Sequence, residues 1–261
     1  MARFYPLFSS SKGNSSYIGN ENSGILIDAG VSCKRLVCAL ENNGISPEAV
    51  QGIFITHTHS DHIFGLKILT KKYNIPVYAQ TVNLEILAAS DKVAPDAAMY
   101  SVDGREIEVG GFCINSFETP HDTPASCGYR IVCPDGKVIV TCTDLGEITP
   151  EVDENLTGAD MVLLESNYDE KMLRNGSYPY ILKQRIASSH GHLSNSDCSR
   201  QLKKLIKGGT CRFVLGHLSQ ENNTAFIAEN SAVGFLDEFR RNRDYLLDIA
   251  APDGNGMAVA F

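Results

Sequence analysis

A short stretch near position 60, Thr56–His62, contains four side chains of the types that bind metal ions in proteins. His57 and His59 are two residues apart, so they point to the same side of an extended segment. Asp61 and His62 are adjacent and must point in different directions, which suits two neighbouring ions better than one. Imidazole and carboxylate groups are typical ligands of zinc, manganese and iron. The stretch therefore predicts a metal centre.

A strand and a helix must hold this stretch in place. Ile53–Ile55, directly before it, has the β-branched and aromatic residues of a buried strand. From Asp61 onward the apolar residues follow the spacing of a helix packed on one side: Ile63, Leu66, Ile68 and Leu69. The four candidate ligands are thus expected at a turn between strand and helix.

Other polar residues follow predicted strands in the same way. His121 follows the strand Phe112–Thr119, Asp144 follows Lys137–Cys142, Glu165 follows Met161–Leu164, and His217 follows Arg212–Leu215. Asp144 is of special interest because a carboxylate can bridge two cations. Asp28 ends the strand that begins at Gly24, where a carboxylate could orient a ligand histidine.

The remaining pattern alternates strands and helices. We expect a polar loop at Ser9–Ser16 and a polar connection at 91–104. Helices are expected at Ser32–Asn43, from Thr81, within 168–212 (including Ser194–Lys207), and over about 15 residues from Asn223. Further strands are expected at Val77–Ala79, Glu106–Val109, Gly128–Cys133, Leu246–Ile249 and Met257–Phe261. The alternation predicts one α/β domain over residues 1–261, with two sheets face to face and helices outside.

Composition narrows the class of protein. The chain has 43 % hydrophobic and 21 % charged residues, as in ordinary globular proteins. It has no apolar run of about 18 residues, so we expect no membrane span, and its start does not resemble a signal peptide. The eight cysteines form no Cys-x-x-Cys pair, which favours reduced thiols and a cytoplasmic location.

The charge is unevenly distributed. The formal net charge is −8, which argues against a broadly basic nucleic-acid-binding protein. Residues 168–212, however, contain nine basic and three acidic residues, a local charge of +6. Such a run is either the solvated face of helices or a surface for an anionic substrate, and the sequence leaves both open.

The pattern His-x-His-x-Asp-His, with Gly65 after it, resembles the signature of the metallo-β-lactamase superfamily. The resemblance implies a four-layer αββα sandwich with two divalent ions, most often Zn²⁺ with Mn²⁺ or Fe as alternatives. It assigns His57, His59 and His121 to one ion. Asp61, His62 and His217 are assigned to the other, with Asp144 as the bridge. A hydroxide held between the ions would attack the substrate.

Three further motifs resemble the YycJ/WalJ group of this superfamily: Ser11–Asn14, Leu164–Asn167 and Gly191–Asn195. The resemblance implies a metal-dependent phosphodiesterase that degrades DNA as a 5′→3′ exonuclease. His192 would be the general acid, Glu165 would orient it, and Asp61 would also accept a hydrogen bond from the hydroxide. Lys12, Asn14 and Asn167 would contact the substrate. His190 has no counterpart and is expected to be a surface histidine.

Other functions share this signature. A ribonuclease Z-like enzyme normally has an extended arm between its aspartate and last histidine motifs, whereas the span from Asp144 to His217 fits compact elements. A glyoxalase II-type thioesterase has a substrate domain after the last ligand, and only 44 residues follow His217. A cyclic phosphodiesterase fits the motifs nearly as well as a nuclease. A metal-stabilised regulatory module without catalysis is the alternative from a different class.

Overall fold

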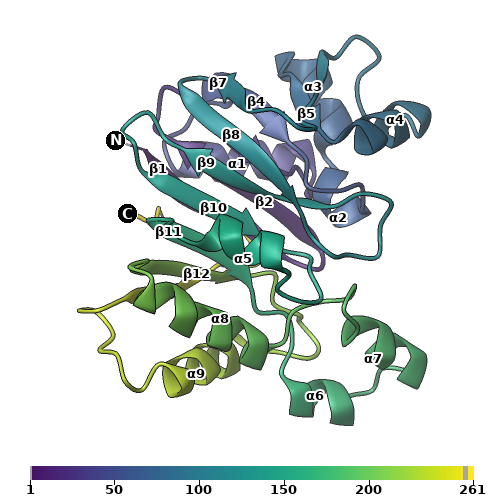
Figure 1. Cartoon of the computed structure of the whole chain (residues 1–261). Helices are drawn as coiled ribbons and strands as arrows, with labels where there is room; N and C mark the ends of the chain where they lie inside the picture. Colours follow the sequence, from purple (N-terminus) through teal and green to yellow (C-terminus); the bar gives the residue numbers. More distant parts are fainter. Residues whose placement is uncertain (1, 255–257) are drawn as a thin grey trace.

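The computed structural model describes residues 2–254 and 258–261, whose strands form two sheets (Figure 1). The first sheet has the order β1-β2-β3-β4-β5-β6, and the second has the order β13-β12-β11-β10-β9-β8-β7. The strands of the first sheet are β1 (Arg3–Ser10), β2 (Gly13–Gly19), β3 (Gly24–Ile27), β4 (Val50–Phe54), β5 (Val77–Ala79) and β6 (Met99–Ser101). Those of the second are β7 (Ile107–Val109), β8 (Phe112–Glu118), β9 (Cys127–Val132), β10 (Val138–Cys142), β11 (Met161–Glu165), β12 (Arg212–Gly216) and β13 (Leu246–Ile249).

Helices cover the outer faces of both sheets (Figure 1). On the first sheet lie α1 (Cys33–Asn42), α2 (Ser60–Ile63), α3 (Leu66–Tyr73) and α4 (Thr81–Ala89), with the short 3₁₀ turn η1 (Pro47–Ala49) before β4. On the second lie α5 (Pro150–Leu156), α8 (Asn195–Lys207) and α9 (Ala225–Phe235). The short helices α6 (Glu170–Asn175) and α7 (Tyr180–Ile186) connect β11 to α8.

A shared core holds the two sheets together. Phe54 from β4 stacks on Tyr78 and meets the ring of Tyr129 edge-on, with ring centroids 4.7 and 5.6 Å apart. Tyr129, on the second sheet, donates a hydrogen bond of 2.6 Å to the carbonyl of Ile55. Because Ile55 directly precedes the histidine stretch, this contact fixes the stretch against the opposite sheet. The predicted four-layer αββα sandwich of the metallo-β-lactamase fold is confirmed.

Parallel strands explain why the predicted ligands lie together. Strands β3 to β6 pair in parallel in the first sheet, and β10 to β13 pair in parallel in the second. The carboxyl ends of parallel strands meet at one edge of their sheet, where open α/β sheets usually bind ligands. The chain segments that follow β3, β4, β10, β11 and β12 carry the candidate ligands and their supports.

Several local predictions were wrong. Ser9–Ser16 is not a loop, because β1 and β2 form a hairpin paired from Arg3 to Gly19 that turns at Ser11 and Lys12. Buried hydroxyl groups of this hairpin form hydrogen bonds; the Ser15 hydroxyl, for example, donates to the carbonyl of Asp28 (2.8 Å). The polar connection at 91–104 contains the short strand β6.

The helices also differ in detail from the prediction. The helix expected from Asp61 is interrupted between α2 and α3, where the Gly65 amide donates to the carbonyl of Ala29 (2.8 Å). The helix expected over about 15 residues from Asn223 spans 11, Ala225–Phe235.

At the C-terminus, Met257 of the strand expected at Met257–Phe261 lies outside the described residues. The part that follows makes one isolated bridge, between Val259 and Phe4. Within the described chain, we find no helix with the length and hydropathy that a bilayer crossing requires.

Candidate metal centre

The predicted ligands converge at one edge of the sandwich although they come from distant parts of the chain. The candidate ligands form four overlapping groups. Within each group the possible ligand atoms, one from each side chain, lie within 4.8 Å of one another. The groups are His57 with His59 and His121; His57 with His62 and Asp144; Asp61 with His62 and His217; and Asp144 with Glu165, His192 and His217. The seven side chains that the sequence assigns to metal thus form one continuous cluster.

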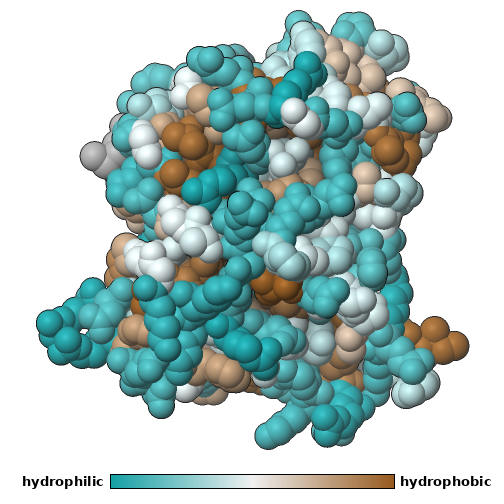
Figure 2. Space-filling model, viewed as in Figure 1, coloured by the Kyte–Doolittle hydropathy of each residue, from teal (hydrophilic) through white to brown (hydrophobic). Residues whose placement is uncertain are grey.

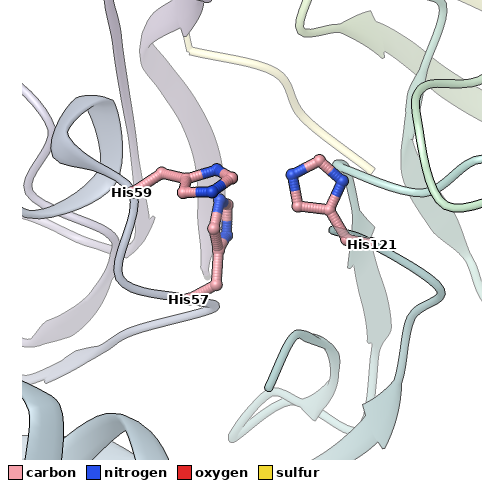
Figure 3. Close-up of side chains that lie close together, drawn as sticks. All are labelled: His57, His59 and His121. Atoms are coloured by element: carbon pink, nitrogen blue, oxygen red, sulfur yellow. The ribbon is translucent and has the colours of Figure 1, made fainter. Parts of the chain in front are cut away.

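The first group brings together three imidazoles (Figure 3). His57 and His59 come from the turn after β4, and His121 faces them from the segment after β8 (Figure 3). The ring centroids of His57 and His59 are 4.7 Å apart, and each lies 5.1 Å from that of His121. The three ring faces are nearly perpendicular, so their nitrogens point to a common space instead of stacking.

Asp144 lies between this group and the second one. One of its carboxylate oxygens is 3.3 Å from Nε2 of His62, and the other is 3.7 Å from Nε2 of His121. Asp61, next to His62, lies 3.8 Å from Nε2 of His217. The arrangement offers two ligand sets that share the Asp144 carboxylate, as a binuclear site requires.

Each buried histidine of the cluster is anchored through Nδ1, which leaves Nε2 of His57, His121 and His217 without a partner, whereas Nε2 of His62 lies 3.0 Å from the Asn14 side-chain nitrogen. His57 Nδ1 is 3.0 Å from the Thr56 hydroxyl, His62 Nδ1 is 2.7 Å from Asp28, His121 Nδ1 is 3.0 Å from the Gly191 carbonyl, and His217 Nδ1 is 2.6 Å from Glu165. In metal-binding histidines, a hydrogen bond from the ring nitrogen that does not bind metal fixes the tautomer and the orientation of the ring. The anchoring therefore prepares Nε2 of His57, His121 and His217 for metal.

The donor set fits divalent cations. Nε2 of His57, His121 and His217 and one oxygen of Asp144 are buried and have no hydrogen-bond partner among the described residues. A buried polar atom without a partner costs about 1–3 kcal/mol, so four of them at one place indicate a missing ligand. Burial lowers the pKa of His57 well below its ordinary value, which keeps this ring neutral, as metal binding requires.

Two carboxylates hold the supporting network. Asp28 accepts hydrogen bonds from the Thr56 amide (2.9 Å), the Thr56 hydroxyl (2.9 Å) and His62 (2.7 Å). Glu165 is fully buried and accepts from Nδ1 of both His192 (2.9 Å) and His217 (2.6 Å) through one oxygen. Asp28 therefore orients a ligand histidine, and Glu165 orients His192 and His217 together.

Charges within the cluster reinforce one another. Burial alone would raise the pKa of Glu165, but the neighbouring His192 and His217 lower it to about 2. Burial opposes a proton on His217, whereas the carboxylates of Asp144, Asp61 and Glu165 raise its pKa to about 10. Glu165 thus stays ionised at neutral pH, and the proton that His217 holds there must leave before a metal ion binds its Nε2.

Three residues of the centre have left-handed backbone conformations. Asp28, Asp144 and His217 have φ values of 62°, 58° and 53°. Such conformations are uncommon for residues other than glycine and cost on the order of 1–3 kcal/mol each. Asp28 and His217 directly follow a strand and Asp144 lies two residues after one, so in each case the left-handed conformation ends the strand at the centre, where the contacts described above hold the side chain.

The three residues predicted to contact substrate occupy different surroundings. Lys12 is exposed at the β1–β2 turn and borders the same pocket as Asp61. Asn14 is buried and its amide donates to Asp61 (3.2 Å). Asn167 is buried and its amide donates to the carbonyl of His217 (2.8 Å). Lys12 and Asn167 each border a pocket beside the cluster, and the two asparagines also contact candidate metal-ligand residues. His190 is exposed, as expected for a surface histidine.

The basic interval 168–212 is largely neutralised by acidic residues, most of which come from other parts of the chain. Six of its cations contact a carboxylate: Arg185 with Asp122, Arg200 with Asp197, Lys203 and Lys207 with Glu238, Lys204 with Asp153, and Arg212 with Asp248. Lys183 donates instead to backbone carbonyls. The solvated helical face, one of the two interpretations left open by the sequence, therefore fits better than an anionic-substrate surface.

Sequence reasoning missed the residues that allow close packing behind the centre. A Cβ atom on Gly30 would lie 1.7 Å from the backbone carbonyl oxygen of Asp61 and 2.6 Å from the backbone nitrogen of Asn14. Thr56 was also missed, although it links Asp28 to two histidines. No local pattern marks either residue, because their partners lie far away in the sequence.

We expect Gly30→Ala to destabilise the fold by about 1–3 kcal/mol, the usual cost of overpacking, and to weaken metal binding by displacing Asp61. The control is Gly234→Ala in α9, where the new Cβ would meet nothing within 4 Å. This control should raise stability by about 0.5–1 kcal/mol, because alanine favours helix. Urea unfolding and metal analysis would measure both effects; equal stability of the two variants would contradict the packing argument.

Comparison with known proteins identifies relatives. A family model described as the metallo-beta-lactamase superfamily matches residues 11–217. The chain is 36 % identical over 233 residues to "Exodeoxyribonuclease WalJ" of Streptococcus pneumoniae serotype 2, covering 88 % of this chain and 86 % of that protein. It is 34 % identical over 237 residues to "Exodeoxyribonuclease YycJ" of Bacillus anthracis, covering 90 % and 89 %.

Among solved structures, the metallo-beta-lactamase fold protein YhfI of Bacillus subtilis has a similar fold. Its TM-score is 0.75, and the match covers all of both chains at 15 % identity. At this identity the likeness concerns the fold alone. The fold, the geometry of the cluster and the relatives all fit the metallo-beta-lactamase superfamily.

Proposed function

The chain belongs to the metallo-beta-lactamase superfamily, and from this premise we propose that it is a binuclear metal-dependent phosphodiesterase that degrades DNA as a 5′→3′ exonuclease. Two observations support the class of reaction: the paired ligand sets that share Asp144, and the further histidine, His192, that lies beside them on Glu165. The choice of DNA rests on the relatives, both of which are named exodeoxyribonucleases.

The contact between His192 and Glu165 is the observation that carries the proposal. His192 is held through Nδ1, and its ring centroid lies 5.2 Å from that of His121 and 5.3 Å from that of His217. The other ring nitrogen, Nε2, is therefore available at the border of the metal centre. A site that only bound metal would have no use for an oriented, partly exposed histidine at this position.

His192, Glu165 and Asp61 have different roles in the proposed reaction. When bound, two divalent cations would activate water and stabilise the negative charge of the phosphoryl group. The chain's own residues then provide the rest. His192 donates a proton from Nε2 to the leaving sugar oxygen, and Glu165, which accepts from Nδ1, orients the ring and stabilises the doubly protonated form that this requires. The side chain of Asp61 is 22 % exposed and can accept a hydrogen bond from the attacking water.

Zinc is the metal that we propose first, because imidazole and carboxylate ligands suit it, with manganese or iron as alternatives. No cysteine belongs to any candidate metal-binding group among the described residues. We further propose that the protein acts in the cytoplasm, which the eight free cysteines support. Lys12 remains our proposed substrate contact, while Asn14 and Asn167 are proposed to position Asp61 and His217.

A panel of labelled substrates tests the function. The metal-loaded protein should release short products from the 5′ end of single- or double-stranded DNA, and Asp61→Asn should abolish most of this release while the protein stays folded. A tRNA 3′ precursor, RNA and cyclic nucleotides are the comparison substrates. Preferential cleavage of any of these would replace the exonuclease proposal with that activity. No cleavage by either the wild type or the variant would favour a regulatory module.

A further inference from the structure

Two cations beside the metal centre differ from those of the basic interval. Lys12, at the β1–β2 turn, and Arg35, in the first turn of α1, are exposed. Neither has an ion pair with a carboxylate in the part of the chain that the structure describes, although the whole chain carries a net charge of −8. The Arg35 guanidinium lies 4.8 Å from the centroid of the Phe8 ring, which limits its movement without neutralising it.

These cations share a pocket with a metal-ligand candidate and an exposed aromatic ring. The pocket has a volume of about 320 Å³, and its lining includes Lys12, Arg35, Asp61 and Phe64. It also includes Ser32, the N-cap of α1, so the positive end of a ten-residue helix faces the same space. The pocket therefore has two cations on one side and the candidate metal ligand Asp61 in its lining.

Phe64 is held rigidly but remains 69 % exposed. It directly follows α2, between the buried Ile63 and Gly65. A Cβ on Gly65 would lie 2.1 Å from the Val31 carbonyl oxygen, so the backbone beside Phe64 is packed tightly against the preceding loop. An exposed ring on a fixed backbone, two residues from a ligand histidine, gives no stability to this chain. It is well suited to stack on a flat partner.

We propose that Phe64, Lys12 and Arg35 form a subsite that holds the DNA strand next to the scissile phosphate. A base stacks on Phe64, and backbone phosphates contact the two cations. Base–aromatic stacking tolerates any base sequence, and cations that follow the backbone add affinity without specificity. The inference rests on the proposed function and names the part of the substrate that this pocket binds.

The position of His192 indicates which part of the DNA strand lies in the Phe64 subsite. His192 lines a second pocket of about 170 Å³, and Ser11 is the residue common to both pockets. During hydrolysis, water forms the new bond to phosphorus while the bond to the leaving sugar oxygen breaks. That oxygen takes the proton of His192, which a proton of the water replaces. The leaving nucleotide therefore lies on the His192 side, and the Phe64 subsite holds the strand that keeps the phosphate.

Oligonucleotide binding tests the stacking contact. The assay uses metal-loaded His192→Ala protein, so that the DNA stays intact, and a single strand that contains the fluorescent base 2-aminopurine. Phe64→Ala should weaken binding about 5- to 150-fold, the range for loss of one base–aromatic stack, and should restore 2-aminopurine fluorescence. Phe64→Tyr, which keeps the ring, should bind like the parent. The control is Phe226→Ala, because Phe226 is 73 % exposed but lines neither pocket.

The salt dependence of binding tests the two cations independently. Each phosphate contact on a single strand contributes about 0.7 to the slope of log K against log salt. Lys12→Ala with Arg35→Ala should thus reduce the magnitude of that slope by about 1.4 if each cation contacts one phosphate. Arg200→Ala, which removes a cation paired with Asp197, should leave the slope unchanged.

The outcomes separate this inference from the proposed function. Cleavage of DNA by the wild type, with unchanged binding and fluorescence in Phe64→Ala, would overturn the subsite and keep the exonuclease. Absence of cleavage, with binding that depends on Phe64, would overturn the exonuclease and keep the subsite. Metal content and melting temperature are measured for each variant. If Phe64→Ala changes either of them, the subsite is judged by the salt dependence of the Lys12 and Arg35 variants: an unchanged slope would then overturn it.

Discussion

His192→Ala should lower the rate of DNA hydrolysis by about 10²- to 10⁴-fold without loss of metal, the range for removal of a general acid. The physical reason is that a sugar alkoxide is a poor leaving group and needs a proton as the bond to phosphorus breaks. His192 contacts Glu165 and belongs to the group with Asp144, Glu165 and His217, but the two ligand sets that we propose do not include it. Single-turnover rates on end-labelled DNA, measured together with metal content, give the result.

Two comparisons make this prediction specific. On bis(p-nitrophenyl) phosphate, whose leaving group departs without a proton, His192→Ala should lose much less activity than on DNA. His190→Ala removes an exposed histidine two residues away and should behave as the wild type. An equal loss on both substrates would show that His192 acts on binding or metal content and is not the proton donor.

Asp144→Asn should lower DNA hydrolysis by roughly 10³-fold or more, because transition-state stabilisation by metal is worth several kcal/mol. Asp144 is 2 % exposed, and its oxygens lie near His62, His121 and His217. An amide carries no charge and bridges cations poorly, so the variant should hold fewer metal ions per chain. Metal analysis and hydrolysis rates measure the two effects.

The thermal stability of the same variant provides a second readout. Metal at about 100 times its Kd stabilises the folded state by about 2.7 kcal/mol per site, or roughly 5–10 °C in Tm for a chain of this size. The wild type should show this rise and Asp144→Asn should show much less. Asp135→Asn, at the exposed turn between β9 and β10, is the matched control. A full metal-dependent rise in Asp144→Asn would contradict a bridging role.

The sequence predicted the metal cluster well because its signals are local. His57 and His59 share one side of an extended turn, and each distant candidate lies within a few residues after a predicted strand. In a sandwich with parallel central strands, the strand ends must meet. Counting residues after strands therefore pointed to Asp144 and His217 at one edge of the second sheet, whereas His121 follows the antiparallel strand β8 and only the packing of the two sheets brings all three to the histidine stretch.

Features that depend on long-range contacts could not be predicted. Ser9–Ser16 looked like a loop because its residues are polar, but β1 and β2 bury them in a hairpin. Asn14 carries the same amide whether it contacts substrate or Asp61, and only the fold places it beside Asp61. Residues 168–212 looked basic because their acidic partners, such as Glu238 and Asp153, lie outside that interval.

Anomalous diffraction from crystals of the zinc-loaded protein tests the central claim most directly, because it locates bound ions without reference to activity. We expect two peaks per chain. One should lie between His57, His59 and His121, the other between Asp61, His62 and His217, and both should contact Asp144. A single peak, or zinc bound only at cysteines or at surface carboxylates, would contradict a binuclear centre in this protein.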